Sequence, residues 1–139
     1  NRTGCLANET VTTGNSLSSD PAFLKKLAQL EINALAMETS EQRVLANLSA
    51  GNRPGSVSSV LNAISAETLQ KADELAIEVA AYYGLPYQPV ALEVGGPSPI
   101  GSAITLPLMP SYMNNRMRTI AGGSAEVQRN IVAKAILEL

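Results

Sequence analysis

The stretch GGSAEVQRNIVAKAILEL, residues 122–139, decides the predicted fold of this chain. Its two leading glycines allow a tight backbone turn, and the Ser124 hydroxyl can accept a hydrogen bond from a first-turn amide. Glu126 then places a negative charge where the dipole of a helix favours it. Apolar residues recur behind this start at helical spacing, namely Val127, Ile131, Ala135 and Ile136, flanked by Val132 and Leu139. We therefore predict a capped C-terminal helix that packs against other helices.

A long helix is predicted upstream, over residues 20–50. Asp20 is a good N-cap and Pro21 suits the first helical position, where its missing N–H costs nothing. Glu41 interrupts the apolar stripe, either as a buried acid with a function or, more simply, as a margin residue whose carboxylate reaches water. The stripe itself consists of Phe23, Leu27, Leu30, Ala34, Met37, Val44 and Leu48.

A second long helix is predicted over residues 56–84. The turn formers of 51–55 separate it from the first helix, and Ser56 or Ser58 can cap its start. Gly84 followed by Leu85 and Pro86 ends it. Two long helices joined by so short a link are antiparallel neighbours. The expected apolar face is Val57, Leu61, Ile64, Ala72, Leu75, Ala76 and Val79.

The rest of the chain is less regular. Residues 1–19 read as a flexible polar arm, and residues 85–110 as a loop rich in proline and glycine that buries apolar side chains against the bundle or against a partner. A short helix is expected at 111–121, before the last helix at 124–138. We therefore predict an all-α, antiparallel up-down helical bundle over residues 20–139, with no sheet.

The composition of the chain excludes several classes of function. The 139 residues carry a net charge of -2, with 4% aromatic residues and no histidine. No basic patch or stacking platform indicates nucleic acid, and no apolar run approaches the ~20 residues of a membrane span. A single cysteine, Cys5, excludes an internal disulfide, and the lack of histidine removes triads and most zinc sites, so no metal is expected. We expect a cytoplasmic location, and the start without methionine reads as a piece of a longer protein.

The string from Gly123 to Ile131 resembles the G-T-S-E-I-Q-R-N-I signature that opens the last helix of acyl-CoA dehydrogenases. The helices predicted over 20–84 resemble the long central helices of that family's C-terminal domain more loosely. The resemblance implies an oxidoreductase of fatty acid metabolism that uses FAD to desaturate acyl-CoA thioesters at the α,β position. It also implies assembly into a dimer or tetramer.

Site residues follow from the same resemblance. Gly123 matches a glycine beside the acyl thioester, while Ser124 and Glu126 match residues that contact the flavin dinucleotide. Their alternative reading is a serine N-cap followed by a first-turn glutamate. Many family members carry the catalytic base, a glutamate, at the position of Gly122. The base therefore lies elsewhere, or the protein is a non-catalytic partner subunit or interaction module that works with a catalytic subunit.

A further family stretch, Q-x-x-G-G, meets the dinucleotide across a dimer interface and falls by register on residues 78–82, without its glycines. Tyr82 and Tyr83 read there as packing residues with hydrogen-bonded hydroxyls. Because the family shares its flavin among several domains, we expect the 139-residue chain alone neither to hold FAD tightly nor to oxidise an acyl thioester.

Overall fold

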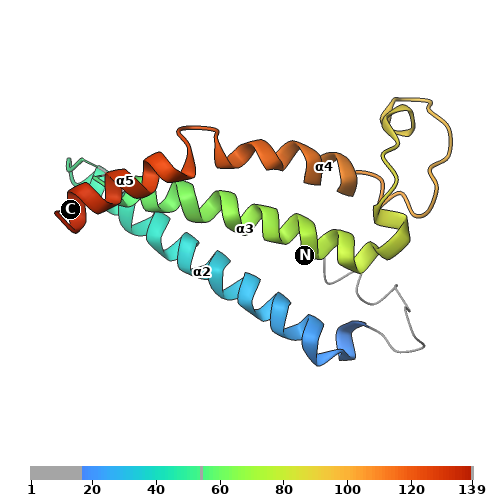
Figure 1. Cartoon of the computed structure of the whole chain (residues 1–139), viewed down its shortest axis with the longest axis horizontal. Helices are drawn as coiled ribbons and strands as arrows, with labels where there is room; N and C mark the ends of the chain where they lie inside the picture. Colours follow the sequence, from blue (N-terminus) through green and yellow to red (C-terminus); the bar gives the residue numbers. More distant parts are fainter. Residues whose placement is uncertain (1–16, 54, 139) are drawn as a thin grey trace.

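A computed structural model describes residues 17–53 and 55–138, and over this part the chain is helical without any strand. This confirms the predicted all-α class. Figure 1 shows the four α-helices, which are α2 (Pro21–Ser49), α3 (Val57–Ala80), α4 (Leu108–Asn115) and α5 (Ala125–Ile136). Short 3-10 turns lie at Leu17–Ser19, Ala81–Gly84, Pro89–Leu92 and Arg116–Thr119.

Helix α3 lies in the middle of the molecule (Figure 1). It contacts α2 on one side, and α4 and then α5 along the other. Helices α2 and α3 run in opposite directions, and α4 and α5 follow one another in the direction opposite to α3, so the antiparallel arrangement expected from the short links is confirmed. Both α4 and α5 are short, and together they cover the length that one long helix covers on the opposite side.

The N-caps predicted for α2 and α5 are confirmed, whereas the one predicted for α3 is not. The Asp20 carboxylate accepts a hydrogen bond from the Ala22 amide at 2.9 Å, with Pro21 at the first helical position. At α3 the expectation of a serine cap is wrong, since Ser56 occupies the N-cap position without a side-chain hydrogen bond. The Ser58 hydroxyl instead donates to the Gly55 carbonyl at 2.9 Å.

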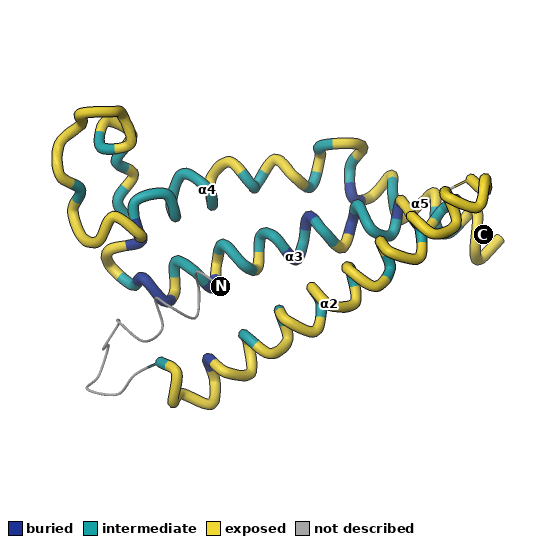
Figure 2. Tube along the Cα trace, turned by 180° about the vertical axis from the view of Figure 1, so that it is seen from behind, coloured by how far each residue is buried: buried dark blue, intermediate teal, exposed yellow. Residues whose placement is uncertain are grey.

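The core is small and lies where α2 begins and α3 ends. Phe23, Leu75 and Val79 are buried there, and four partly buried leucines pack around them: Leu17, Leu27, Leu30 and Leu108. Figure 2 shows that the buried positions gather on α3 while α2 is mostly exposed. Small buried residues on α3, Ala63 and Ala66 among them, let its neighbours approach closely on both sides. Leu17 belongs to the expected polar arm, most of which lies outside the described residues.

The predicted buried stripe of the last helix is wrong. Val127 and Ile136 are about half exposed, and Ile131 and Ala135 are exposed as well. Helix α5 turns Ala125 toward α3, together with Val132 from the flank of the predicted stripe, and Leu139 lies outside the described residues. The largely exposed Arg129 side chain forms an ion pair with Glu67 of α3. The ion pair and the buried Ala125 show which side of α5 faces α3, which periodicity alone leaves open.

Four other burial expectations also fail. Ala34 and Leu48 on α2 are exposed, and so are Val57 and Ile64 on α3. The remaining predicted stripe positions of α2 up to Val44 face inward, and Glu41 is exposed, in agreement with the margin interpretation. On α3 the inward face is wider than predicted because helices pack on both sides of it, so small polar residues such as Ser59 are buried too.

The connection between α3 and α4 spans 81–107 rather than the predicted 85–110, because α3 ends at Ala80 instead of residue 84, and it is more exposed than predicted. Helix α4 begins at Leu108 rather than at Ser111, because Pro110 falls in the first turn, where its missing N–H breaks no hydrogen bond. One expectation was that the loop buries its apolar side chains against the bundle, and this is wrong for most of them. The exposed ones are Leu85, Val90, Leu92, Val94, Ile100 and Ile104. Tyr82 is 86% exposed, so its expected role in packing is wrong.

Candidate functional site

The turn that joins the α4 side of the molecule to α5 is built on two glycines. Gly122 and Gly123 have φ angles of 73° and 98°, a region that residues with a side chain rarely adopt. The Gly122 carbonyl accepts two hydrogen bonds, from the Gln128 amide at 2.9 Å and from the Asn62 amide at 3.3 Å. The turn is therefore held by its own helix and by α3.

A side chain at either glycine would require a neighbouring side-chain amide to move. A Cβ atom at Gly122 would lie 2.9 Å from Nδ2 of Asn62, and one at Gly123 would lie 2.6 Å from Nε2 of Gln128. The two amides that fix the turn thus occupy the space next to each glycine. A carboxylate at position 122 would need Asn62 to move, and it would also carry the cost of a positive φ angle.

Ser124 and Glu126 lie together at the start of α5. The Ser124 hydroxyl oxygen accepts from the Val127 amide at 3.4 Å, which confirms the predicted N-cap. The pKa of the Glu126 carboxyl is lowered, first because the carboxylate accepts from its own backbone N–H, then because it accepts from the Ser124 hydroxyl. The nearby Arg129 guanidinium lowers this pKa further. The exposed Glu126 side chain is thus an ionised hydrogen-bond acceptor at neutral pH.

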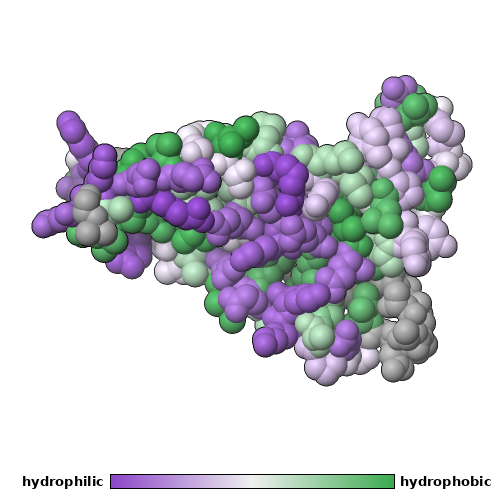
Figure 3. All heavy atoms as spheres, in the orientation of Figure 1, coloured by the Kyte–Doolittle hydropathy of each residue, from purple (hydrophilic) through white to green (hydrophobic). Residues whose placement is uncertain are grey.

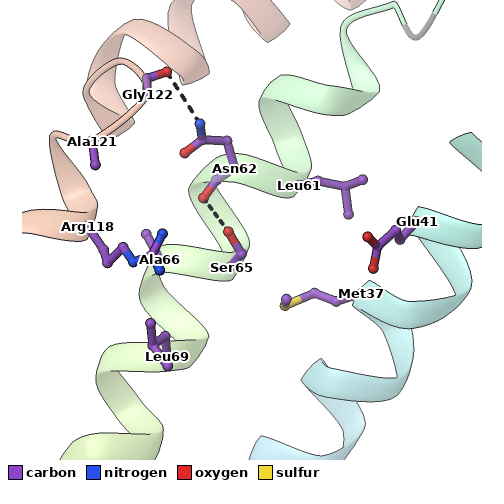
Figure 4. Close-up of a pocket in the computed structure, with 10 residues that line it drawn as sticks. All are labelled: Met37, Glu41, Leu61, Asn62, Ser65, Ala66, Leu69, Arg118, Ala121 and Gly122. Carbon is purple, nitrogen blue, oxygen red and sulfur yellow. Dashed lines mark hydrogen bonds between the residues drawn. The ribbon is translucent and has the colours of Figure 1, made fainter. Parts of the chain in front are cut away.

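A pocket of about 610 Å³ reaches Gly122 from the groove between α2 and α3. Figure 4 shows Glu41 and Met37 pointing from α2 toward α3, with Arg118 and Gly122 on the far side. Glu41 is the carboxylate that lines the pocket. The other lining residues are mostly apolar or small, namely Leu61, Asn62, Ser65, Ala66, Leu69 and Ala121.

Residues 78–82 lie at the other end of α3. Asn62 and Glu78 are separated by roughly 24 Å along the helix at the ~1.5 Å rise per residue, so the structure does not bring this stretch to the glycine turn. Ala81, which the resemblance aligns with the first glycine of Q-x-x-G-G, has φ 48° and ψ -130°. The backbone there keeps a conformation that suits glycine although the residue is alanine. Glu78 forms an exposed ion pair with Lys26 at 2.7 Å.

The approach to the turn is anchored by polar contacts that the sequence did not predict. The Gln70 amide donates to the Asn115 carbonyl at 3.1 Å, and the Asn115 amide donates to the Asp73 carboxylate at 2.8 Å. Arg116 stacks on Tyr112 at 4.3 Å and forms an ion pair with Glu74 at 3.1 Å. Together they fix α4 on α3. The sequence indicates these contacts only through polar residues at helical spacing on α3. They lie on the face of the helix that periodicity assigns to solvent.

Within 17–53 and 55–138 no cluster of acidic, histidine or cysteine side chains could hold a metal ion. The same described ranges contain no helix long and apolar enough to span a membrane.

Residues 1–137 match the family model described as "Acyl-CoA dehydrogenase, C-terminal domain". The match covers nearly the whole chain, so this chain belongs to the acyl-CoA dehydrogenase family and corresponds to its C-terminal helical domain. Neither a curated protein nor a solved structure matches the chain significantly.

Proposed function

We propose that this C-terminal domain of an acyl-CoA dehydrogenase serves an FAD-dependent enzyme that desaturates acyl-CoA thioesters at the α,β position. Within it, the glycine turn and the start of α5 would form the domain's share of the substrate and flavin site. The observation that carries the proposal is the pairing of Ser124 with an ionised, exposed Glu126 directly after a turn locked by Asn62 and Gln128. A cytoplasmic location and a role in fatty acid metabolism remain predictions.

The start of α5 fits one part of a flavin dinucleotide better than another. The ionised Glu126 carboxylate can accept hydrogen bonds from sugar hydroxyls or ring N–H groups, whereas it would repel the pyrophosphate. Ser124 orients that carboxylate through its own hydroxyl, and the exposed Gly123 backbone allows a thioester to approach closely. Bound FAD would supply the acceptor for the hydride that leaves the β-carbon.

Removal of the α-proton needs a base within hydrogen-bond reach, and Gly122 offers only backbone. Glu41, which lines the pocket that reaches Gly122, is the first relocated base to test. The second candidate function is a non-catalytic partner subunit, which keeps the helical domain for assembly and leaves proton abstraction to another chain. It is favoured by the Gly122 turn itself, whose φ angle and contact with Asn62 oppose a carboxylate there.

We also propose that the domain self-associates into a dimer or tetramer. Large apolar side chains are exposed on α2 and α5 and in the loop between α3 and α4, more than the small core buries. Sedimentation velocity at tens of micromolar would reveal the assembly, and a monomer at that concentration would contradict it.

The flavin proposal is tested in the complete protein that contains this domain. Glu126→Gln and Ser124→Ala should each weaken FAD retention at least tenfold after gel filtration, measured by flavin absorbance. Glu38→Gln, which removes an exposed carboxylate from α2, is the matched control and should retain FAD normally. Full retention in both site variants would refute the assignment of these residues.

Activity separates the two candidate functions. A purified complete protein that reduces a dye with acyl-CoA, and loses this when Glu41 becomes Gln while FAD stays bound, would support a relocated base. A protein that holds FAD but reduces no dye without a second subunit would support the partner role, and Gly122→Glu could then create activity. The 139-residue chain alone should be colourless and inactive, since it supplies only one part of the flavin site.

A further inference from the structure

Two of the three arginines in residues 108–138 are paired with acids of α3. Arg116 forms an ion pair with Glu74 at 3.1 Å, and Arg129 forms one with Glu67. Strongly hydrophilic side chains gather over the helices in Figure 3, where charges of both signs can meet. The third arginine, Arg118, forms neither an ion pair nor a hydrogen bond with any residue of 17–53 or 55–138.

The Arg118 side chain instead lies in the wall of the pocket of about 610 Å³ that reaches Gly122. It extends from the 3-10 turn after α4 toward α3 (Figure 4), where the pocket is lined by Ser65, Ala66 and Leu69. None of these side chains can neutralise a guanidinium. Arg118 is therefore an uncompensated positive charge in a pocket whose other walls are mostly small or apolar.

Glu41 is the other charged residue of the pocket, and it does not compensate Arg118. It points into the pocket from α2, whereas Arg118 comes from the α4 side of α3 (Figure 4), and the two form no ion pair. The pocket is thus positive on its α4 side and negative on its α2 side. An anionic group in the pocket is attracted to Arg118 and repelled by Glu41, so the two charges favour one orientation of a ligand with an anionic end.

The free guanidinium determines which ligands fill the pocket favourably. A neutral chain would displace water from Arg118 without replacing the hydrogen bonds that this water makes, and that loss opposes binding. A carboxylate replaces them with charge-assisted hydrogen bonds, and its two oxygens match the fork of the guanidinium. The small and apolar walls suit a hydrocarbon chain between the anionic end and the rest of the ligand.

We propose that Arg118 is a specificity-determining residue, which makes this pocket selective for acyl thioesters whose acyl chain ends in a carboxylate. The inference rests on the function proposed above, because that function places the acyl thioester at the glycine turn, next to the pocket. CoA itself carries phosphates, but the walls beside Arg118 suit an acyl chain rather than a nucleotide.

Two ligands that differ in one group test the proposal: S-pentyl-CoA ends in a methyl group and S-carboxybutyl-CoA in a carboxylate. Both are thioethers without the thioester carbonyl, so their α-protons are not acidic and they bind without turnover. Isothermal titration calorimetry of the complete, FAD-containing protein should give a dissociation constant for S-carboxybutyl-CoA roughly tenfold or more below that for S-pentyl-CoA. In Arg118→Gln this preference should disappear, while S-pentyl-CoA should bind no more weakly than before.

Arg43→Gln is the matched control, since Arg43 is an exposed arginine of α2 outside the pocket lining, and it should keep the preference. Circular dichroism checks that both variants keep their helix content. Equal affinity of the wild type for the two ligands, or a preference that survives in Arg118→Gln, overturns the inference and leaves the proposed function standing. Equal weakening of both ligands and of free CoA in Arg118→Gln assigns Arg118 to the CoA phosphates and also overturns it. If neither ligand binds the complete protein, the proposed function fails together with the inference.

Discussion

The side-chain amide of Asn62 donates to the carbonyl of Gly122 at 3.3 Å and ties the first half of α3 to the turn before α5. The two residues are far apart in the sequence, and both line the pocket between α2 and α3. The same amide occupies the space that a side chain at position 122 would need. This one contact therefore positions the turn and opposes a base on it.

Gly122→Ala should destabilise the chain by about 2 kcal/mol or more, from the cost of a positive φ angle plus the contact with Asn62. Gly51→Ala is the control, because Gly51 has a φ angle of 82° and nothing within 4 Å of its would-be Cβ. This variant should lose only the stability that a side chain at a positive φ angle costs, about 1 kcal/mol. Urea unfolding followed by circular dichroism gives both values. Equal losses would show that Asn62 yields to a side chain without cost.

Ala81→Gly should stabilise the chain by up to about 1 kcal/mol, because glycine relieves the strain of φ 48° and ψ -130° at the end of α3. The same exchange at Ala76, in the regular part of α3, should instead cost about 1 kcal/mol. Thermal melts of the two variants would therefore move in opposite directions. A lower melting temperature for Ala81→Gly would mean that packing of the alanine methyl stabilises the chain by more than the backbone strain at this residue costs.

Phe23→Ala should cost about 3–5 kcal/mol, since it removes the largest fully buried side chain from a small core. Leu35→Ala, on the exposed side of the same helix, should change stability by less than about 0.5 kcal/mol in the monomer. Denaturant titration monitored by helix content compares the two. If Leu35→Ala proved as damaging as Phe23→Ala, the inward face of α2 would be assigned wrongly.

The pKa of Glu126 should lie below the ~4.3 of an unperturbed glutamate, and Ser124→Ala should raise it by removing one hydrogen bond to the carboxylate. Because the pKa is lowered on folding, the stabilisation is present above the unfolded-state pKa and is lost as the pH falls through the folded-state pKa. Carbon-13 NMR titration of the Glu126 carboxyl between pH 2 and 6 checks both statements. If Ser124→Ala leaves the pKa of Glu126 unchanged, the assignment of Ser124 as a hydrogen-bond partner of this carboxylate is wrong.

Short-range features of this protein could be read from its sequence. The Asp20–Pro21 start, the breaker at 51–55, the glycine turn and the Ser124 cap each depend on residues a few positions apart, whose backbone preferences act before any packing. These signals, with the helical periodicity between them, were enough for an all-α antiparallel fold. The motif from Gly123 to Ile131 was enough for the family.

Only the tertiary structure decided which apolar residues are buried and which polar residues form the site. Val127 and Ile131 satisfy the periodicity of a buried stripe, yet both are exposed, while Ala125 is buried and Arg129 forms an ion pair with Glu67 of α3. Asn62 holds the glycine turn, although nothing near it in the sequence indicates a partner on α5's side of the molecule. Periodicity records that a helix has an apolar face, but the rotation of that helix and its distant contacts depend on the shape of its neighbours, which local sequence does not contain.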